Sequence, residues 1–230
     1  MARTTAVVQG FLRVGVVGPF LRWRDHLEVT GAHHIPRSGP VVLVANHQAV
    51  VDSFLVAIAA RRTVVFLAKA EYFTETGLRG RLKQAFFSSV GQIPVDRDGG
   101  DAAASALSTA IGVVRSGRAW AVHPEGSRVT GRRVHRGRTG AMRVAIETGA
   151  PVVPIALIGT ADGRRVWSRR RVTVRVCEPV DTTSMSPSDA RTATDLVMRR
   201  IADAAGWPYV DEYTPRRSST RPSPGGRSAA

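Results

Sequence analysis

The sequence predicts an α/β protein in a single domain, with a mixed, mostly parallel β-sheet flanked by helices. Three observations support this fold class. The chain has 230 residues, 43% of them hydrophobic, which is enough for one domain with a real core. Short apolar runs alternate with segments of helical length. Most of these runs are apolar nearly throughout, as in strands that are buried on both faces of a parallel sheet.

Five apolar runs predict the strands of this sheet. They are residues 41–45, 63–68, 119–122, 152–158 and 172–176. The first four are apolar nearly throughout and predict interior strands. The region of the fifth alternates Val with Arg and Thr, which predicts an edge strand with one face in solvent.

The segments between these runs predict the helices. They are residues 52–60, 78–87, 102–115, 140–148 and 188–205. The last follows Ser186-Pro187-Ser188, residues typical of a helix start, and its apolar positions recur at amphipathic spacing. Helices between the strands would cover both faces of the sheet.

The chain is predicted to have three parts, and only the middle one is a folded domain. Residues 1–30 form an N-terminal amphipathic segment, residues 31–213 the domain, and residues 214–230 a basic tail. The tail has four arginines, no acidic residue and no apolar periodicity, which predicts disorder. No internal repeat or linker divides the middle part.

The N-terminal segment is apolar but contains no run long enough to span a bilayer. Arg13 interrupts it, and Gly15, Gly18 and Pro19 disfavour a continuous helix. Its Val, Leu and Phe residues are followed by Arg22-Trp23-Arg24, a composition typical of a helix that lies in a membrane interface. An ordinary first helix packed on the core is the alternative.

The strong basic charge indicates an anionic partner. Lys and Arg number 33 against 18 Asp and Glu, a formal charge of +15, and all but two of the basic residues are arginines, which suit phosphate. A nucleic-acid-binding module is not expected, because aromatic residues are only 6%, the basic residues are scattered and no known binding signature occurs. The single cysteine, Cys177, excludes an internal disulfide framework and a cysteine-based zinc cluster.

The first candidate site is Asn46-His47-Gln48-Ala49-Val50-Val51-Asp52, directly after a buried run. Ligands bind at the carboxyl ends of parallel strands, where this cluster would lie. Five residues separate His47 from Asp52, so the two can meet only if the chain turns and Asp52 begins the next helix. Asp52 could then cap the helix or accept the Nδ1 proton of His47, leaving Nε2 free as a base. Without such a contact, His47 is an unrelated surface histidine.

Three further blocks follow along the chain. Gly91–Arg97 places an arginine after a short apolar run, and His123–Arg128 contains Pro-Glu-Gly-Ser-Arg, a pattern suited to an anion. In that block Gly126 would let backbone N–H groups approach a ligand closely, and Ser127 and Arg128 would donate hydrogen bonds to it. Glu125 could hold arginines in place. Pro151–Leu157 is apolar and indicates a buried strand that could form a pocket wall.

Taken together and in this order, the four blocks resemble the 1-acylglycerol-3-phosphate acyltransferase family of glycerolipid acyltransferases. That family carries N-H-x-x-x-x-D, then G-x-x-x-x-x-R, then P-E-G-T-R and a V-P block. The resemblance spans roughly residues 39–179 and implies a fold like that of glycerol-3-phosphate acyltransferase. This sequence differs in having Ser127 in place of Thr, which keeps the hydroxyl, and His123 where an aromatic or apolar residue usually stands.

The resemblance implies transfer of a fatty acyl group from a thioester to the free hydroxyl of 1-acylglycerol-3-phosphate, giving phosphatidate in phospholipid biosynthesis. His47 would be the general base and Asp52 would orient it. Asn46 would face the oxyanion or support the site, and Val153, Pro154 and Ile155 would form the acyl-pocket wall. The residues expected to bind the acceptor phosphate are Lys69, Arg97, Glu125, Gly126, Ser127 and Arg128.

The resemblance also implies the partners. Acyl-CoA or acyl carrier protein would be the cosubstrate, with no other cofactor and no metal, and the acceptor would be lysophosphatidate. Glycerol-3-phosphate, another lysophospholipid or a lyso-aminolipid are alternative acceptors. The basic charge and the N-terminal segment favour peripheral or monotopic attachment to an anionic surface on the cytoplasmic face of the membrane.

The sequence is less consistent with two other enzyme classes. A metallohydrolase could use His47, Asp52, His123 and Glu125, since these residue types ligate metals, but the Cys-x-x-Cys partner of the zinc deaminases is impossible with one cysteine. A serine hydrolase would need Gly-x-Ser-x-Gly, which does not occur. A lipid-binding relative without activity is disfavoured by the complete His, Asp, Glu and Arg set.

Overall fold

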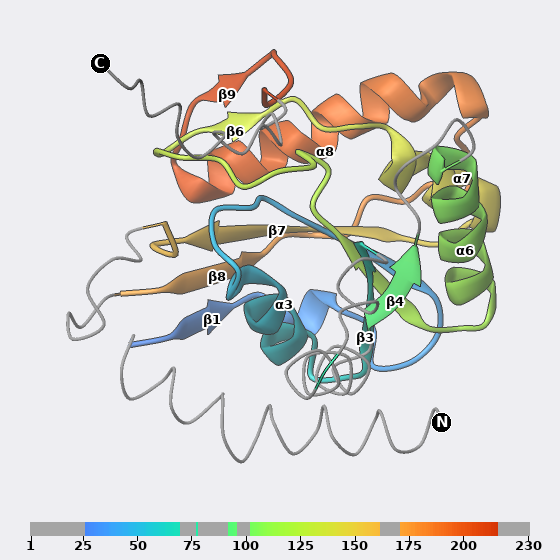
Figure 1. The fold of residues 1–230 in the computed structure, drawn as a ribbon, viewed down its shortest axis with the longest axis horizontal. Helices are drawn as coiled ribbons and strands as arrows, with labels where there is room; N and C mark the ends of the chain where they lie inside the picture. Colours follow the sequence, from blue (N-terminus) through green and yellow to red (C-terminus); the bar gives the residue numbers. More distant parts are fainter. Residues whose placement is uncertain (1–25, 70–76, 78–91, 96–101, 162–170, 216–230) are drawn as a thin grey trace, which may run out of the picture.

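The predicted α/β fold is confirmed by the computed structural model. It describes residues 26–69, 77, 92–95, 102–161 and 171–215. Seven strands form one sheet in the order β1-β8-β7-β2-β5-β3-β4 (Figure 1). They are β1 (Glu28–Thr30), β2 (Val41–Ala45), β3 (Val64–Lys69), β4 (Gln92–Val95), β5 (Ala119–Val122), β7 (Val152–Ile158) and β8 (Thr173–Val176).

Most of the sheet is parallel, with two antiparallel strands on one side. The strands from β7 to β4 all run the same way, whereas β8 is antiparallel to β7 and β1 is parallel to β8. The expectation that residues 172–176 form an edge strand is wrong, because β1 pairs with β8 on its outer side. The Val and Arg alternation is real, since Arg175 is exposed, but the three-residue β1 is too short to be recognised from its sequence.

Four of the five predicted helices are confirmed, and the fifth, 78–87, lies outside the described residues. The helices are α3 (Asp52–Ala60), α6 (Ala102–Arg115), α7 (Gly140–Thr148) and α8 (Ala190–Ala205). Helix α8 begins two residues later than expected because a 3-10 turn, Pro187–Asp189, comes first. In that turn the N–H of Ser186 donates to the Asp189 carboxylate at 2.7 Å.

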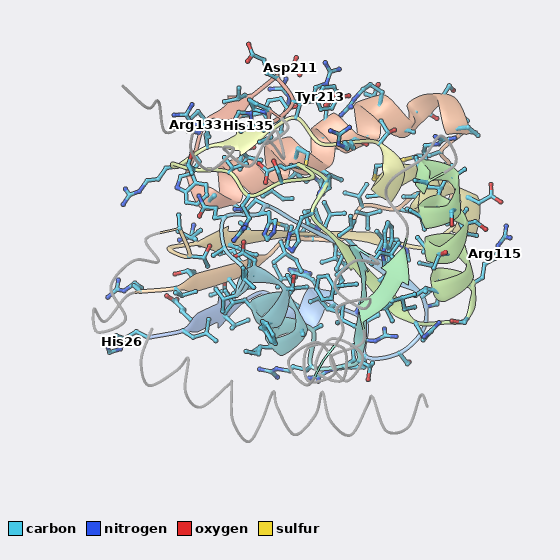
Figure 2. The ribbon with its side chains drawn as sticks, viewed as in Figure 1. His26, Arg115, Arg133, His135, Asp211 and Tyr213 are labelled. Atoms are coloured by element: carbon cyan, nitrogen blue, oxygen red, sulfur yellow. The ribbon has the colours of Figure 1, made fainter. Side chains whose placement is uncertain are left out.

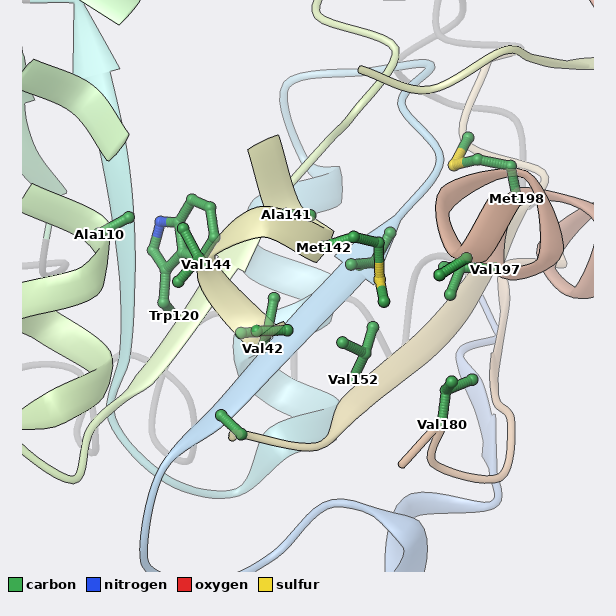
Figure 3. Close-up of a cluster of buried hydrophobic side chains, with 14 of the residues drawn as sticks. Val42, Ala110, Trp120, Ala141, Met142, Val144, Val152, Val180, Val197 and Met198 are labelled. Carbon is green, nitrogen blue, oxygen red and sulfur yellow. The ribbon is translucent and has the colours of Figure 1, made fainter. Parts of the chain in front are cut away.

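The two faces of the sheet carry two separate hydrophobic clusters. Val42, Trp120 and Val152 point to the face covered by α6, α7 and α8, where Met142 and Val197 pack against them (Figure 3). The other face is covered by α3, whose apolar side chains pack against the alternate strand residues. Each large side chain buried in this way contributes about 1.5–3 kcal/mol to stability, so both layers hold the central strands in place.

A small second sheet lies beside α8 and joins two distant parts of the chain. Strand β6 (Val134–His135) pairs in parallel with β9 (Tyr209–Val210), and the N–H of Arg136 donates to the carbonyl of Val210 at 2.9 Å. Figure 2 shows His135 close to Tyr213 and Asp211 at this end of the molecule. The segment after α8 therefore fixes the loop that follows β5.

The two expected terminal segments lie mostly outside the described residues. Residues 1–25 and 216–230 are not described, so the interface helix and the basic tail stay predictions. Residues 28–30, which the predicted boundary assigns to the N-terminal segment, form β1 of the main sheet. In the part of the chain that the structure describes, no helix combines the length and apolarity needed to cross a membrane.

Candidate active site

The first and third sequence blocks meet because their strands are neighbours. Strands β2 and β5 are parallel and in register, with Val44 opposite Val122. Their carboxyl ends therefore lie side by side at one edge of the sheet, the usual place for ligands in such folds. The residues that come next are Asn46-His47 after β2 and His123-Pro124 after β5. They begin the two segments that form the candidate site.

The sequence block after β2 brings His47 and Asp52 into contact. The chain turns over residues 48–51, and Asp52 is the first residue of α3. The Nδ1 atom of His47 lies 2.9 Å from Oδ2 of Asp52, whose side chain is fully buried. No side chain caps α3, so the helix-capping alternative does not describe Asp52. Its Oδ2 instead accepts the backbone N–H groups of Gln48 at 2.6 Å and Ala49 at 2.7 Å.

These contacts define the charge on Asp52 and the tautomer of His47. Burial alone raises the pKa of the Asp52 carboxyl, but the hydrogen bonds from His47, Ala49 and Gln48 outweigh it, so that this pKa lies below its ordinary value. An ionised carboxylate only accepts hydrogen bonds, so the neutral His47 ring carries its proton on Nδ1 and its lone pair on Nε2. The His47 side chain is 21% exposed, which leaves the ring accessible from outside.

Asn46 supports the site from inside the sheet. Its side chain is buried, and its amide oxygen accepts the N–H of Leu157 at 2.8 Å while its amide nitrogen donates to the Leu157 carbonyl at 2.9 Å. These two bonds tie the end of β2 to β7. The supporting half of the expectation for Asn46 fits this geometry, whereas an oxyanion contact does not, because the amide faces β7.

Glu125 also supports the site, which differs from its expected place in a phosphate pocket. Its side chain is 2% exposed, and its two oxygens accept the backbone N–H groups of His47 and His135, each at 2.8 Å. Burial raises the pKa of Glu125 to about 7; the two N–H bonds oppose this shift and the charge of Asp52 adds to it. An inward-facing carboxylate of this kind holds backbone in place and would repel a phosphate.

The loop after β5 holds the His47 turn at further points. The N–H of Val129 donates to the carbonyl of His47 at 2.8 Å, so both backbone groups of His47 are bonded to this loop. The side-chain amide of Gln48 donates to the carbonyl of Gly131 at 2.7 Å. The position of the His47 backbone is therefore determined by residues about 80 positions away in sequence.

The expected phosphate residues are placed only in part. Gly126 has a positive φ of 77°, and a Cβ on it would lie 3.0 Å from Nε of Arg138. Ser127 is half-buried and Arg128 is exposed, in the same loop. Lys69 ends β3, next to β5 in the sheet, but its side chain lies outside the described structure, as does the whole of Arg97. Residues 126–128 therefore lie in the loop that holds His47, whereas the roles of Lys69 and Arg97 stay predictions.

The expected acyl-pocket wall is divided between the two faces of β7. Val153 and Ile155 belong to the cluster under α3, fully buried in the core. Pro154 lies between them and therefore on the opposite face, because successive strand residues point to opposite sides of a sheet. The three residues do not form one continuous wall.

Sequence reasoning missed two contributions to the site. The backbone N–H of His135 binds Glu125, and a backbone group carries no signal in the sequence. The side chain of Arg138 lies over Gly126, but nothing in the sequence distinguishes this arginine from the many others. Within the ranges that the structure describes, no group of three His, Cys, Asp or Glu side chains is arranged to hold a metal ion.

Comparison with known proteins identifies the family. The protein-family model described as Acyltransferase matches residues 26–158, more than half of the chain, and this range contains His47, Asp52 and the whole loop up to Arg138. The chain belongs to the Acyltransferase family. The family membership that the four sequence blocks predict is thereby confirmed.

Relatives and a solved structure agree with the family. The 1-acyl-sn-glycerol-3-phosphate acyltransferase alpha of Mus musculus is 31% identical over 180 residues, which cover 74% of this chain and 60% of the relative. The 1-acyl-sn-glycerol-3-phosphate acyltransferase of Borreliella burgdorferi is 31% identical over 132 residues, 57% of this chain and 51% of the relative. The match thus spans between half and two thirds of these relatives.

The same fold occurs in a crystal structure. The 1-acyl-sn-glycerophosphate acyltransferase PlsC from Thermotoga maritima superposes with a TM-score of 0.66 at 25% sequence identity, covering 86% of this chain and 79% of that protein. The mixed sheet with its flanking helices is therefore the fold of a known acyltransferase of this family.

Proposed function

We propose that this protein is a 1-acylglycerol-3-phosphate O-acyltransferase that transfers a fatty acyl group from a thioester to the acceptor's free hydroxyl. The observation that carries the proposal is the 2.9 Å contact between His47 Nδ1 and the buried carboxylate of Asp52. The names of the relatives from mouse and Borreliella burgdorferi supply the acceptor. The donor is the thioester of coenzyme A or of acyl carrier protein.

The reaction needs one base and no covalent intermediate. Nε2 of His47 removes the proton from the acceptor hydroxyl while the oxygen attacks the thioester carbonyl carbon. The new C–O ester bond forms, the C–S bond breaks, and the imidazolium returns its proton to the leaving thiolate. Asp52 stabilises that imidazolium and keeps Nε2 directed to the substrate. A positioned general base of this kind contributes about 10² to 10⁴ in rate.

The acceptor phosphate is bound by the loop that follows Glu125. Arg128 is exposed in this loop, which is tied to His47 through Val129. A guanidinium pairs with two phosphate oxygens at once, and Ser127 adds a hydroxyl donor. Lys69 and Arg97 complete the phosphate site in this proposal.

The protein binds to the cytoplasmic face of an anionic membrane. The segment 126–146 has no acidic residue, and five of its arginines are exposed: Arg128, Arg132, Arg133, Arg138 and Arg143. Val50, 65% exposed, lies in the neighbouring turn, which Gln48 joins to this loop. Each basic residue near an anionic leaflet adds about 1 kcal/mol of binding. Sedimentation with vesicles of phosphatidylglycerol is expected to be salt-sensitive and to fail with phosphatidylcholine alone.

A direct assay tests the reaction. Purified protein, oleoyl-CoA or oleoyl-acyl carrier protein, and oleoyl-lysophosphatidate are combined in mixed micelles, and phosphatidate is measured by mass spectrometry. His47→Ala should lower kcat by at least about a hundredfold, whereas His33→Ala, at an exposed histidine in the turn before β2, should not. Wild-type activity in His47→Ala would contradict the mechanism.

A second pair of variants tests the phosphate site. Arg128→Ala should raise the KM for lysophosphatidate and leave kcat nearly unchanged, because the phosphate contact is the same in the ground and transition states. Arg115→Ala is the matched control, since Arg115 is an exposed arginine paired with Glu147 at the far end of the molecule (Figure 2). An unchanged KM in Arg128→Ala would remove Arg128 from the phosphate site.

A further inference from the structure

The ring of His123 lies face to face with the ring of His47. The two ring centroids are 4.2 Å apart and the planes differ by only 10°. The contact follows from the sheet, because Val44 and Val122 are paired and each histidine comes within three residues of its strand partner. On this geometry His123 belongs to the environment of His47, although its sequence context does not assign it a contact.

The hydrogen bonds of His123 permit one tautomer. Its Nδ1 lies 3.1 Å from the carbonyl oxygen of Ala45 and 3.0 Å from that of Asn46. Carbonyl oxygens only accept, so Nδ1 carries the proton, and Nε2 is the acceptor that faces the hydroxyl of Ser53 at 3.4 Å. Both nitrogens are therefore occupied, and the ring is anchored to the end of β2.

The surroundings of His123 keep its ring uncharged. Burial and, to a lesser extent, the neighbouring His47 lower the pKa of His123 to about 4, against the opposing effects of the Asp52 carboxylate and of the two carbonyl hydrogen bonds. These two side chains are the titratable groups that face it among the described residues, while Phe66 packs at a centroid distance of 6.1 Å. At neutral pH a neutral aromatic face therefore covers His47.

One hydrogen bond does not fully orient a ring. The bond from Nδ1 to Asp52 sets the direction of the His47 ring within its plane but allows the plane to tilt about that bond. A parallel ring in van der Waals contact removes this freedom. It also offers its π-face to the imidazolium that forms when His47 accepts a proton.

We propose that His123 is a positioning residue for His47: its ring, anchored on the carbonyls of Ala45 and Asn46, fixes the plane of the general base. This inference rests on the proposed function for its kinetic consequence but not for its structural content. Asp52 and His123 divide the task, because the carboxylate orients Nε2 and the stacked ring holds the plane.

Three substitutions separate the stacked ring from the anchor. His123→Phe keeps an aromatic face and loses the hydrogen bonds, His123→Asn keeps an N–H donor and loses the ring, and His123→Leu loses both. A small misplacement of a reacting group can cost up to about a hundredfold in rate, so we expect kcat to fall about tenfold or more in His123→Leu and His123→Asn. His123→Phe should stay within about threefold of wild type, with the KM of lysophosphatidate nearly unchanged in all three.

A spectroscopic measurement distinguishes positioning from a loss of stability. The Hε1 resonance of His47, assigned with the His47→Ala variant in protein labelled at histidine, reports the stacked ring through its shielding. We expect it to move downfield in His123→Leu and to remain shielded in His123→Phe. Ile201→Val, a core change in α8 that lowers stability, should alter neither this resonance nor kcat.

The outcomes are distinct for the two proposals. If wild type makes no phosphatidate, the proposed function fails, and the His47 resonance still tests the role of His123. Wild-type kcat together with an unmoved resonance in His123→Leu would overturn the positioning role. An equal loss of kcat in His123→Phe and His123→Leu, with the His47 resonance still shielded in His123→Phe, would also overturn it, because a stacked aromatic face would then have no effect on the reaction.

Discussion

Two buried carboxylates lie in the two turns that form the site, and their environments affect them in opposite ways. Asp52, at the end of the turn after β2, accepts two backbone N–H groups and the His47 ring, and its pKa is lowered. Glu125, in the loop after β5, also accepts two backbone N–H groups, yet burial raises its pKa to about 7. Both carboxylates accept two backbone N–H groups, but only Asp52 also binds the His47 ring and lies near His123, whereas the charge of Asp52 raises the pKa of Glu125.

In the mechanism that we propose, this difference separates a catalytic partner, Asp52, from a structural support, Glu125. A carboxylate that stabilises an imidazolium must remain ionised throughout the reaction, as the lowered pKa of Asp52 ensures. A carboxylate that only holds backbone N–H groups has no such requirement, and Glu125 retains a cost of burial that the fold offsets. The two turns are nevertheless joined, because Glu125 binds the N–H of His47.

The largest expected effect is that of Asp52→Asn. The amide oxygen can take the place of Oδ2 and still accept the N–H groups of Gln48 and Ala49 and the Nδ1 proton of His47. It carries no charge, however, so the imidazolium that forms in the reaction is no longer stabilised. We expect kcat to fall by about 10² to 10⁴, as for comparable carboxylate–histidine pairs. Steady-state acyl transfer measures the loss, and Asp203→Asn, an exposed position on α8, is the control. A loss below threefold would mean that the charge of the carboxylate does not stabilise the imidazolium.

The next effect is the pH dependence of stability. The folded pKa of Glu125, about 7, exceeds its ordinary value of 4.5, so the folded protein holds this proton more tightly. The stabilising contribution is therefore present below pH 4.5 and is lost as the pH rises to about 7, by about 3 kcal/mol at most. Urea unfolding of wild type and Glu125→Gln across this range isolates the change, because His123, with its lowered pKa, contributes the opposite slope to both proteins. If the free energies of unfolding of wild type and Glu125→Gln changed with pH in the same way, the raised pKa of Glu125 would be contradicted.

Glu125→Gln should also lower activity, by less than the Asp52 variant. Glutamine has one acceptor oxygen, so either the His47 or the His135 N–H loses its partner, at a cost of about 1–3 kcal/mol in stability. We expect a fall of about tenfold in kcat as the His47 turn loosens, with substrate KM values little changed. Glu147→Gln, on the exposed face of α7, serves as the control in the same assay. A rise in the lysophosphatidate KM alone would instead place Glu125 in the phosphate pocket.

The smallest effect concerns backbone conformation in the loop after β5. Gly126→Ala places a Cβ at a φ of 77° and 3.0 Å from Arg138, which should cost about 1–2 kcal/mol. Gly112→Ala, within α6 with open space around it, should instead stabilise by about 0.5–1 kcal/mol. Thermal unfolding of both variants compares them directly. Equal unfolding temperatures for the two variants would show that the loop after β5 tolerates a side chain at position 126.

Much of the fold was predictable because its main strands are uniformly apolar. Strand β2 and helices α3, α6 and α7 have the predicted bounds, since runs of Val and Ala and the change to helical periodicity are local signals. The order of the strands was not predictable in the same way. The pairing of β1 with β8 joins residues more than 140 positions apart, and β6 and β9 are two-residue strands with no periodicity.

The site was predictable in its residue types and less so in its contacts. The spacing of His47 and Asp52 allowed either a pair or a capping residue beside a surface histidine, and the turn in the structure distinguishes them. Strand alternation alone places Val153 and Ile155 on one face of β7 and Pro154 on the other, although the apolar block Pro151–Leu157 was expected to form one wall. Glu125 was expected among the phosphate-binding residues because it belongs to the Pro-Glu-Gly-Ser-Arg block. The sequence does not show which groups its carboxylate faces.

The α/β class, the bounds of the central elements and the residue types from which a general base and a phosphate site can be built could all be predicted from the amino-acid sequence. These depend on local periodicity and on side-chain chemistry, which each segment carries alone. Only the tertiary structure decided that β5 lies beside β2, that Glu125 holds the His47 backbone and that the ring of His123 covers the ring of His47. Such contacts depend on strand order and register, which are set by the packing of the whole sheet between its two helical layers.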